Sequence, residues 1–471
     1  MTLKASDFTH VDLAELTAIH VVGAGGAGMN AIAAVLLSMG HSVSGSDLRE
    51  SAGVNRLRSM GARIEVGHDA SNIGNASLIC RSTAVPDSNV EILAALDAGR
   101  VVLSRAEILA AICSNKQTIA VAGTHGKTTT SSMLALALTA AGLEPSFIVG
   151  GDLNDIGSGA VWNDHGELFV VEADESDGTF LKVGAATAIV TNLESDHLDY
   201  FGNYDALVQA FTEFLDAVDG PRIVCIDDPG AAGLATEVGG CLTYGTADNA
   251  DYRVVGINSS RYASNFEVIR GGKRITKCDL PVPGIHNVLN ATAAFATAVE
   301  MGADPDLVTT ALARFAGVAR RFEFRGEHQG VVYVDDYAHL PTEVSAVLAA
   351  ARTGDWDRIV AVFQPHRYSR TAELWREFGD SFVDADHIVL TGVYGAGESP
   401  RPGITGDLLV RAILDDHPKS SVTYLPGREQ VADYLDSILR PGDLCLTMGA
   451  GDLTSVADEV QSRRKSSRPS Q

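Results

Sequence analysis

The chain lacks the features that would place it in a membrane or outside the cell. It has no apolar run approaching the ~18 residues of a membrane span, and residues 1–8 contain no apolar signal core. Its six cysteines are scattered without C-x-x-C spacing, which is typical of thiols in a reducing cytosol rather than of a disulfide framework. We therefore expect a cytoplasmic protein that does not bind membranes.

Positive charge and aromatic residues are also scarce. The 36 Lys and Arg residues face 60 Asp and Glu residues, which gives a net charge of -24. Such an acidic chain repels anions, so we expect no nucleic-acid partner, and an anionic substrate would need locally clustered arginine and lysine. Aromatic residues make up 6% of a chain that is 45% hydrophobic, which favours aliphatic α/β layers over β-sandwiches.

Residues 117–133 carry the most informative pattern that is present. The apolar residues 118–122 lead into a glycine-punctuated turn and then a helix-forming run; the turn reads Gly123, Thr124, His125, Gly126, Lys127, Thr128, Thr129. This arrangement wraps the phosphates of a nucleotide, with Lys127 as a point charge and Thr128 offering its hydroxyl to phosphate-bound Mg²⁺. Val121 replaces the first glycine of the usual spacing, which makes a tighter loop. We predict ATP binding here.

A second glycine-rich turn lies near the start of the chain and contains Gly23, Gly25, Gly26 and Gly28. It follows the apolar residues 19–22 and precedes a helix pattern and a strand that ends at Asp47. The spacing fits the dinucleotide-fold fingerprint, with Asp47 close to where a ribose-binding acid is expected. Alone, this pattern predicts a diphosphate at a helix start but not which nucleotide carries it.

Strand and helix patterns alternate along the whole chain, which predicts an α/β protein with doubly wound sheets. We place three domains at residues 1–114, 115–321 and 322–471. The polar, glycine-rich residues 239–277 are predicted to be a β-rich excursion of the second domain. The polar and basic residues 462–471 are predicted to form a disordered tail.

Several polar residues stand at the ends of predicted strands, where open parallel sheets bind ligands. Glu172 ends an apolar strand and is a candidate Mg²⁺ ligand, whereas Asp177 fits an acidic surface turn. His197 follows the next strand between two acids, and for it a metal-ligand role and a structural role weigh equally. His286 and Asn290 lie four residues apart at a helix start, so both can face a nucleotide, with helix capping as the alternative for His286.

The later part of the chain adds cationic candidates. Arg321 lies at a predicted domain junction, where it can be solvated or can reach a transferred phosphoryl group. Arg367 and Arg370 are one helical turn apart, so both guanidinium groups can clamp one carboxylate or phosphate. Three further polar residues follow a strand, namely Asp336, Tyr337 and His339.

Together these segments resemble the Mur ligase family over nearly the whole chain, in residues 23–29, 123–129, 172–177, 191–197, 283–287, 335–339 and 363–370. His125 and the Gln-Pro-His-Arg run at residues 364–367 are similar to the alanine-adding member, because sister ligases tend to have asparagine at the loop position. The resemblance implies a Rossmann-like first domain that binds a UDP-sugar. It also implies a central P-loop ATPase-type α/β domain and a Rossmann-like third domain.

The resemblance further implies a reaction with ATP and Mg²⁺ in peptidoglycan precursor synthesis. ATP would phosphorylate the lactyl carboxylate of UDP-N-acetylmuramate, and the amine of L-alanine would attack the acyl phosphate. A carboxylate is a poor electrophile and must acquire a leaving group, and bringing two anions together requires fixed positive charge. We expect a monomer or a weak homodimer.

Three sets of site residues follow from the same resemblance. The catalytic residues are Lys127, Glu172, His197, Arg367 and Arg370, and the metal ligands are Thr128, Glu172 and His197. The nucleotide-binding residues are Gly123, Thr124, His125, Gly126, Lys127, Thr128, Thr129, His286, Asn290, Arg321 and Asp336. The residues for the sugar nucleotide and alanine are Gly23, Gly25, Gly26, Gly28, Asp47, Tyr337, His339, Arg367 and Arg370.

Two positions depart from the family's pattern. Leu340 stands where the family commonly has a second histidine, so we assign no function to it. Residues 198–215 contain no lysine, so the carbamylated lysine that several sister ligases use is not expected here.

Three alternatives to the alanine-adding activity remain. A murein-peptide recycling ligase shares the phosphate loop but attaches a preformed peptide, and it resembles this chain less at the first glycine loop. A nicotinamide-dependent oxidoreductase is suggested by that glycine loop alone and leaves Lys127, Glu172 and His197 unexplained. A non-catalytic regulator would bind ATP without turnover.

Overall fold

The computed structural model describes residues 11–13, 18–196 and 198–466. The chain divides into two compact units, Met1–Val255 with Glu267–Cys278 and Leu289–Phe315, and Gly256–Phe266 with Asp279–Val288 and Ala316–Gln471. Among the described residues, no helix combines the length and the apolar character needed to cross a lipid bilayer. The domain boundaries placed at residues 114 and 321 stay a prediction.

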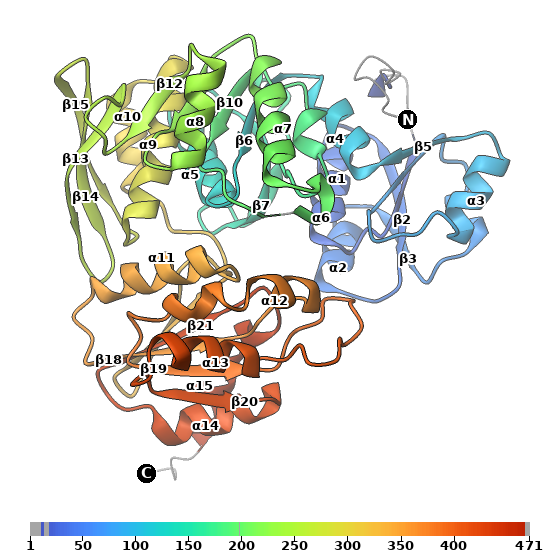
Figure 1. The fold of residues 1–471 in the computed structure, drawn as a ribbon. Helices are drawn as coiled ribbons and strands as arrows, with labels where there is room; N and C mark the ends of the chain where they lie inside the picture. The colour runs from blue at the N-terminus through green and yellow to red at the C-terminus, as the bar shows by residue number, and fades with distance from the viewer. Residues whose placement is uncertain (1–10, 14–17, 197, 467–471) are drawn as a thin grey trace. The chain divides into compact units, whose positions relative to one another are not determined.

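The first sheet has five strands in the order β3-β2-β1-β4-β5, and every neighbouring pair is parallel. Its strands are β1 Ala18–Val22, β2 Ser42–Asp47, β3 Arg63–Val66, β4 Leu78–Arg81 and β5 Val101–Ser104. Its helices are α1 Ala27–Ser38, α2 Ala52–Ser59, α3 Val90–Asp97 and α4 Arg105–Cys113. Val21 joins the core of Ile32 and Ile108, whereas Val22 joins that of Ile92, because successive strand residues face opposite sides. Helices therefore cover both faces (Figure 1).

A second sheet has ten strands in the order β15-β14-β13-β12-β11-β10-β6-β9-β7-β8. Its strands are β6 Gln117–Ala122, β7 Ser146–Leu153, β8 Ser158–Val161, β9 Leu168–Glu172, β10 Thr187–Val190, β11 Arg222–Cys225, β12 Leu242–Gly245, β13 Tyr252–Ser259, β14 Ser264–Arg270 and β15 Lys273–Leu280. The α-helices along this part of the chain are α5 Lys127–Ala140, α6 Leu198–Phe201, α7 Tyr204–Asp216, α8 Pro229–Val238, α9 Ile285–Glu300 and α10 Pro305–Leu312. The predicted β-rich residues extend this sheet as β12 to β15. The parallel pairing of β6 with both β9 and β10 brings three strand ends together.

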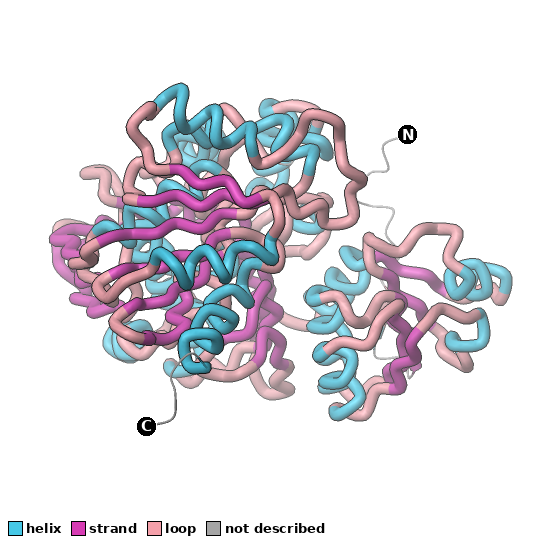
Figure 2. Tube along the Cα trace, turned by 90° about the horizontal axis from the view of Figure 1, so that it is seen from below, coloured by secondary structure: helices cyan, strands magenta, loops and turns pink. Residues whose placement is uncertain are grey.

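The second unit contains a six-stranded sheet in the order β16-β17-β21-β18-β19-β20, in which only β16 runs antiparallel to its neighbour. Its strands are β16 Glu323–His328, β17 Val331–Asp336, β18 Arg358–Phe363, β19 His387–Thr391, β20 Val422–Leu425 and β21 Asp443–Met448. Its helices are α11 Pro341–Arg352, α12 Tyr368–Leu374, α13 Asp407–Asp416, α14 Val431–Ile438 and α15 Val456–Ser466. One core holds α11 and α13 against the sheet and another holds α14 and α15, so this sheet is doubly wound. Figure 2 shows strands in magenta and helices in cyan.

The predicted disordered tail is wrong for residues 462–466, which continue α15. Arg464 is buried there, and its Nε donates to Oδ1 of Asp436 at 2.8 Å while Nη2 donates to the carbonyl of Leu439 at 2.9 Å. A buried guanidinium with such acceptors is satisfied. The polar composition concealed this contact, because an arginine that packs inward looks the same in a sequence as one that is solvated.

Candidate functional site

The predicted phosphate loop is the turn between β6 and α5. Gly126 adopts a φ of 81°, and a Cβ atom there would lie 2.5 Å from Oδ1 of Asn290, so the position requires glycine. α5 begins at Lys127 without a side-chain cap from the described residues. The first N–H groups of a helix form an anion site, so this turn has the geometry of a phosphate cradle.

Lys127 lies partly buried in this loop. Its Nζ donates to the carbonyls of Gly123 at 2.6 Å and Thr124 at 3.2 Å, and lies 2.8 Å from Oε1 of Glu175. Burial alone would lower the pKa of Lys127, but the negative charges around it, led by Glu175, raise it. Burial raises the pKa of Glu175 to about 7. Glu175 therefore holds the ammonium group where a phosphate could replace it, a contact that the sequence analysis missed.

Thr128 and Glu172 lie together, as expected for two groups around one Mg²⁺. The Thr128 hydroxyl is 2.9 Å and 3.1 Å from the two Glu172 carboxylate oxygens. The N–H of Gly150 donates to Oε2 of Glu172 at 2.7 Å, which fixes the carboxylate. Hard oxygen donors of this kind suit Mg²⁺. No cluster of three His, Cys, Asp or Glu ligands occurs in the described part of the chain, so the fit depends on this mixed pair.

The strand end after β10 supports the loop from the other side. The N–H of His125 donates to Oδ1 of Asn192 at 2.7 Å, and the Thr191 hydroxyl donates to the carbonyl of His125 at 2.6 Å. His125 Nε2 lies 3.3 Å from Oε2 of Glu194. Thr191, Asn192 and Glu194 belong to the segment 191–197, in which the sequence analysis assigned a role only to His197. His197 lies outside the described residues.

The two polar residues of α9 lie in different surroundings. Asn290 is buried and lies against Gly126 of the phosphate loop, in agreement with a nucleotide-facing position. His286 packs on the turn at Gly284, where a Cβ atom would come within 2.7 Å of its ring. Burial lowers the pKa of His286 to about 4, so its imidazole is neutral at physiological pH. The nucleotide-binding role of both residues stays a prediction.

The first glycine loop joins β1 to α1 and is tied to the end of β2. The N–H groups of Gly23 and Ala24 donate to the carbonyl of Ser46 at 2.9 Å and 3.0 Å. The N–H of Gly25 donates to Oδ2 of Asp47 at 2.8 Å. Asp47 therefore positions the loop, and its role in binding a ribose stays a prediction. Gly26 stands at the N-cap of α1 without a side-chain cap among the described residues, another helix start suited to an anion.

A buried carboxylate, Glu91 of α3, organises the strands behind this loop. It accepts from the Ser46 hydroxyl at 2.6 Å and from the Asn72 amide at 2.6 Å, and it lies 3.3 Å from Nε2 of His20. Burial alone would raise the pKa of Glu91, but hydrogen bonds from His20, Ser46 and Asn72 lower it to about 2. Glu91 thus anchors Ser46, whose carbonyl holds the glycine loop.

Replacing Glu91 by glutamine is expected to destabilise the first unit by about 2 kcal/mol at pH 7, because a buried charged acceptor is lost. A carboxyl group with a lowered folded pKa adds stability above its unfolded pKa of 4.5 and loses it as the pH falls towards 2. The gap in thermal midpoint between wild type and variant should therefore be narrower at pH 4 than at pH 7. Glu65→Gln, on exposed β3, is the control; an equal gap at both pH values would contradict the assignment.

In the second unit, a buried carboxylate lies beside cationic residues. Asp336 accepts N–H groups from Phe322 and Ala338, each at 2.7 Å, and burial raises its pKa to about 6 against the opposing charge of Arg321. The guanidinium carbon of Arg321 lies 5.1 Å from the centroid of the Tyr337 ring, within cation–π range. Arg321, Asp336 and Tyr337 therefore form one group, although the sequence analysis assigned Tyr337 to a different ligand from Arg321 and Asp336, and these roles stay predictions.

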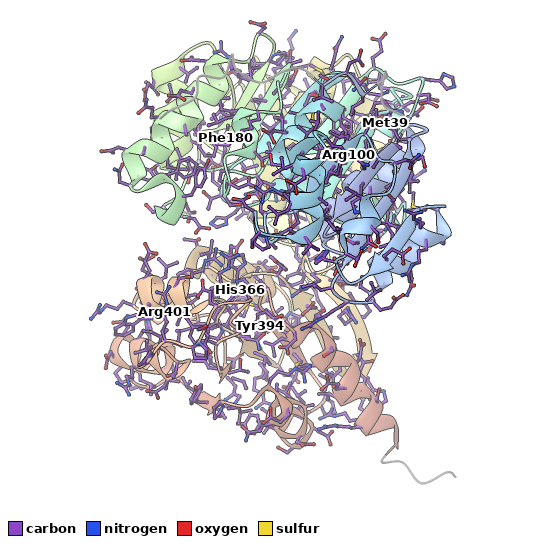
Figure 3. The ribbon with its side chains drawn as sticks, turned by 90° about the vertical axis from the view of Figure 1, so that its right-hand side faces the viewer. Met39, Arg100, Phe180, His366, Tyr394 and Arg401 are labelled. Atoms are coloured by element: carbon purple, nitrogen blue, oxygen red, sulfur yellow. The ribbon has the colours of Figure 1, made fainter. Side chains whose placement is uncertain are left out.

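The predicted arginine clamp differs in detail from the expectation. α12 begins at Tyr368, and Arg367 precedes it with a φ of 66°, so the expected helical spacing of one turn between the two arginines is wrong, while their clamping of one anion stays a prediction. Arg370 contacts Nδ1 of His366 at 3.3 Å. The His366 ring stacks on Tyr394 at 5.9 Å between centroids and lies 5.8 Å from the His339 ring. Figure 3 labels His366 and Tyr394. Burial and the neighbouring His339 and arginines lower the pKa of His366 to about 3.

The comparisons with known proteins agree with this geometry. Three family models match the chain: the Mur ligase family catalytic domain at residues 18–117, the Mur ligase middle domain at residues 121–298, and the Mur ligase glutamate ligase domain at residues 320–451. Curated proteins named UDP-N-acetylmuramate–L-alanine ligase are 46% identical in Solidesulfovibrio magneticus and 47% identical in Kineococcus radiotolerans. Each alignment covers 95% of this chain, and 98% and 96% of the respective relative.

A solved structure titled UDP-N-acetylmuramate-alanine ligase, from Thermotoga maritima, has a TM-score of 0.81 at 30% identity. The match covers 96% of this chain and all of that one. The motif resemblance and the α/β fold class are therefore confirmed. Because the likeness extends from the first glycine loop through the phosphate loop to the last sheet, the chain belongs to the Mur ligase family.

Proposed function

We propose that the chain joins L-alanine to the lactyl carboxylate of UDP-N-acetylmuramate at the expense of ATP, in peptidoglycan precursor synthesis. The observation that carries this proposal is the identity of 46% and 47% to proteins named for that reaction, over 95% of this chain. The partly buried Lys127 in its glycine-rich turn supports the ATP-dependent step of this reaction.

The reaction follows from the chemistry of the two substrates. The lactyl carboxylate attacks the terminal phosphorus of ATP, giving an acyl phosphate and ADP. The amine of L-alanine then attacks the acyl carbon, and the tetrahedral intermediate expels phosphate and forms the amide. Lys127, its Nζ 2.6 Å from the Gly123 carbonyl, would neutralise charge on the transferred phosphoryl group. Mg²⁺, held by Thr128 and Glu172, would neutralise further phosphate charge.

The remaining candidate residues divide by position in the fold. The first glycine loop and Asp47 would bind the UDP moiety, and Asn290 would contact ATP beside Gly126. His286, Arg321 and Asp336 would complete the nucleotide site. The acyl group and alanine would meet four residues of the second unit, namely Tyr337, His339, Arg367 and Arg370.

Purified protein with ATP, Mg²⁺ and both substrates is expected to yield UDP-N-acetylmuramoyl-alanine, detected by mass spectrometry. Phosphate release should require both the sugar nucleotide and an amino acid, which a non-catalytic regulator would not show. L-Alanine should be used faster than a tripeptide amine. Faster tripeptide turnover would instead identify a murein-peptide recycling ligase.

A further inference from the structure

Arg105, the first residue of α4, has no role in the function proposed above. Its backbone position is fixed by the capping box at the start of α4, in which Ser104 accepts from the Glu107 N–H and Glu107 accepts from the Ser104 N–H. The side chain passes Gly28 of the first glycine loop, where a Cβ atom would lie 3.3 Å from its Nη1. Arg105 is therefore held beside the start of α1.

The guanidinium group of Arg105 reaches from the first sheet to the acidic segment after β9. Its Nη2 lies 2.8 Å from Oδ2 of Asp177 and 3.3 Å from Oδ2 of Asp174. About a quarter of the arginine side chain is exposed, and its Nε is buried without an acceptor among the described residues. The reading of Asp177 as a simple acidic surface turn is therefore incomplete.

The two aspartates shape the segment between them. Asp174 accepts from the Ser176 N–H at 3.0 Å, and Asp177 accepts from the Thr179 N–H at 3.1 Å. Phe180, which follows, packs on Phe211 with ring centroids 4.9 Å apart. Residues 174–180 are thus held by the ion pairs with Arg105 and by the packing of Phe180 in the core.

Glu175, the partner of Lys127, lies between Asp174 and Asp177 in this segment. Burial would raise the pKa of Asp174, but the charges of Lys127 and Arg105 help to lower it. The ion pairs of Arg105 with the two aspartates and of Lys127 with Glu175 are therefore joined through residues 174–177 into one charged group. Without Arg105, two carboxylates beside the phosphate loop would lose their cation, and an incoming polyphosphate would meet more negative charge.

We propose that Arg105 is a positioning residue for ATP: by holding Asp174 and Asp177 it keeps Glu175 against Lys127 and limits the negative charge around the phosphate loop. The kinetic part of this inference rests on the proposed function, whereas the ATP-binding part does not. Arg105 also links the loop for ATP to the loop predicted for the sugar nucleotide, because the same side chain adjoins Gly28.

The test is ATP binding to the full-length Arg105→Met variant, measured by calorimetry with MgATP. Affinity is expected to fall about tenfold, which corresponds to the loss of one charged hydrogen bond. Arg105→Lys should recover part of the affinity, because an ammonium group can pair with the same acids. In steady-state assays KM for ATP should rise while KM for L-alanine stays unchanged.

A second substitution separates this role from a merely structural one. Adding Asp177→Asn to Arg105→Met removes one of the two uncompensated negative charges, so the double variant should bind ATP more tightly than Arg105→Met alone. Arg253→Met is the matched control, because Arg253 lies on β13, pairs with Asp248, and is separated from β6 by three intervening strands. Unchanged ATP affinity in Arg105→Met, or further loss in the double variant, would overturn the proposal. If the wild type binds ATP without ligating alanine, the proposed function fails. The comparison of ATP affinities among the variants then still tests whether Arg105 positions the ATP site.

Discussion

Lys127→Ala is expected to slow ligase turnover by on the order of 10³-fold, the effect of removing a preorganised donor from a developing negative charge. The Nζ of Lys127 already lies within the phosphate loop, where it donates hydrogen bonds to the Gly123 carbonyl and to Glu175. Phosphate release in the presence of ATP, sugar nucleotide and L-alanine measures the loss.

The same variant should keep its fold and its affinity for UDP-N-acetylmuramate. Without Lys127 the Glu175 carboxyl loses its partner, but its pKa is already about 7, so it can take up a proton instead of remaining as a buried charge. The sugar nucleotide is expected on the first glycine loop, which belongs to another sheet. Lys273→Ala, at an exposed position of β15, is the control. Loss of sugar-nucleotide binding together with turnover would contradict this assignment of the two loops.

The phosphate loop could be predicted because its information is local. Glycine at position 126, followed by Lys127 and Thr128, specifies a strand-turn-helix within a few residues, and the structure has it. The meeting of Thr128 with Glu172 required one further rule, that the ends of parallel strands meet at one edge of a sheet. The pairing of β6 with β9 satisfies it.

The contacts that were missed depend on distant parts of the chain. Lys127 and Glu175 are 48 residues apart in sequence, and Arg105 and Asp177 are 72 residues apart, so no spacing pattern joins them. The left-handed backbone of Arg367 was equally hidden, because a non-glycine residue adopts it only when its surroundings hold it there. In this case the Arg367 N–H donates to the carbonyl of Tyr394 at 2.8 Å.

Arg367→Ala is expected to lower kcat/KM for the sugar nucleotide by about 10²-fold, because a charged hydrogen bond to the reacting carboxylate or its phosphate would be lost. The backbone contributes independently of the side chain: the Arg367 carbonyl accepts from the Thr371 N–H at 3.1 Å and starts α12. Both main-chain contacts survive in the alanine variant.

A glycine variant separates the two contributions. Arg367→Gly relieves the strain of a φ of 66°, so it should be at least as stable as Arg367→Ala while losing the same activity. Arg376→Ala is the matched control, because that guanidinium is exposed and lies 4.4 Å from the centroid of the Trp375 ring. If Arg367→Gly restored activity, the alanine defect would be a backbone effect. Only equal losses in the two variants, with the control unaffected, place the positive charge itself at the acyl group.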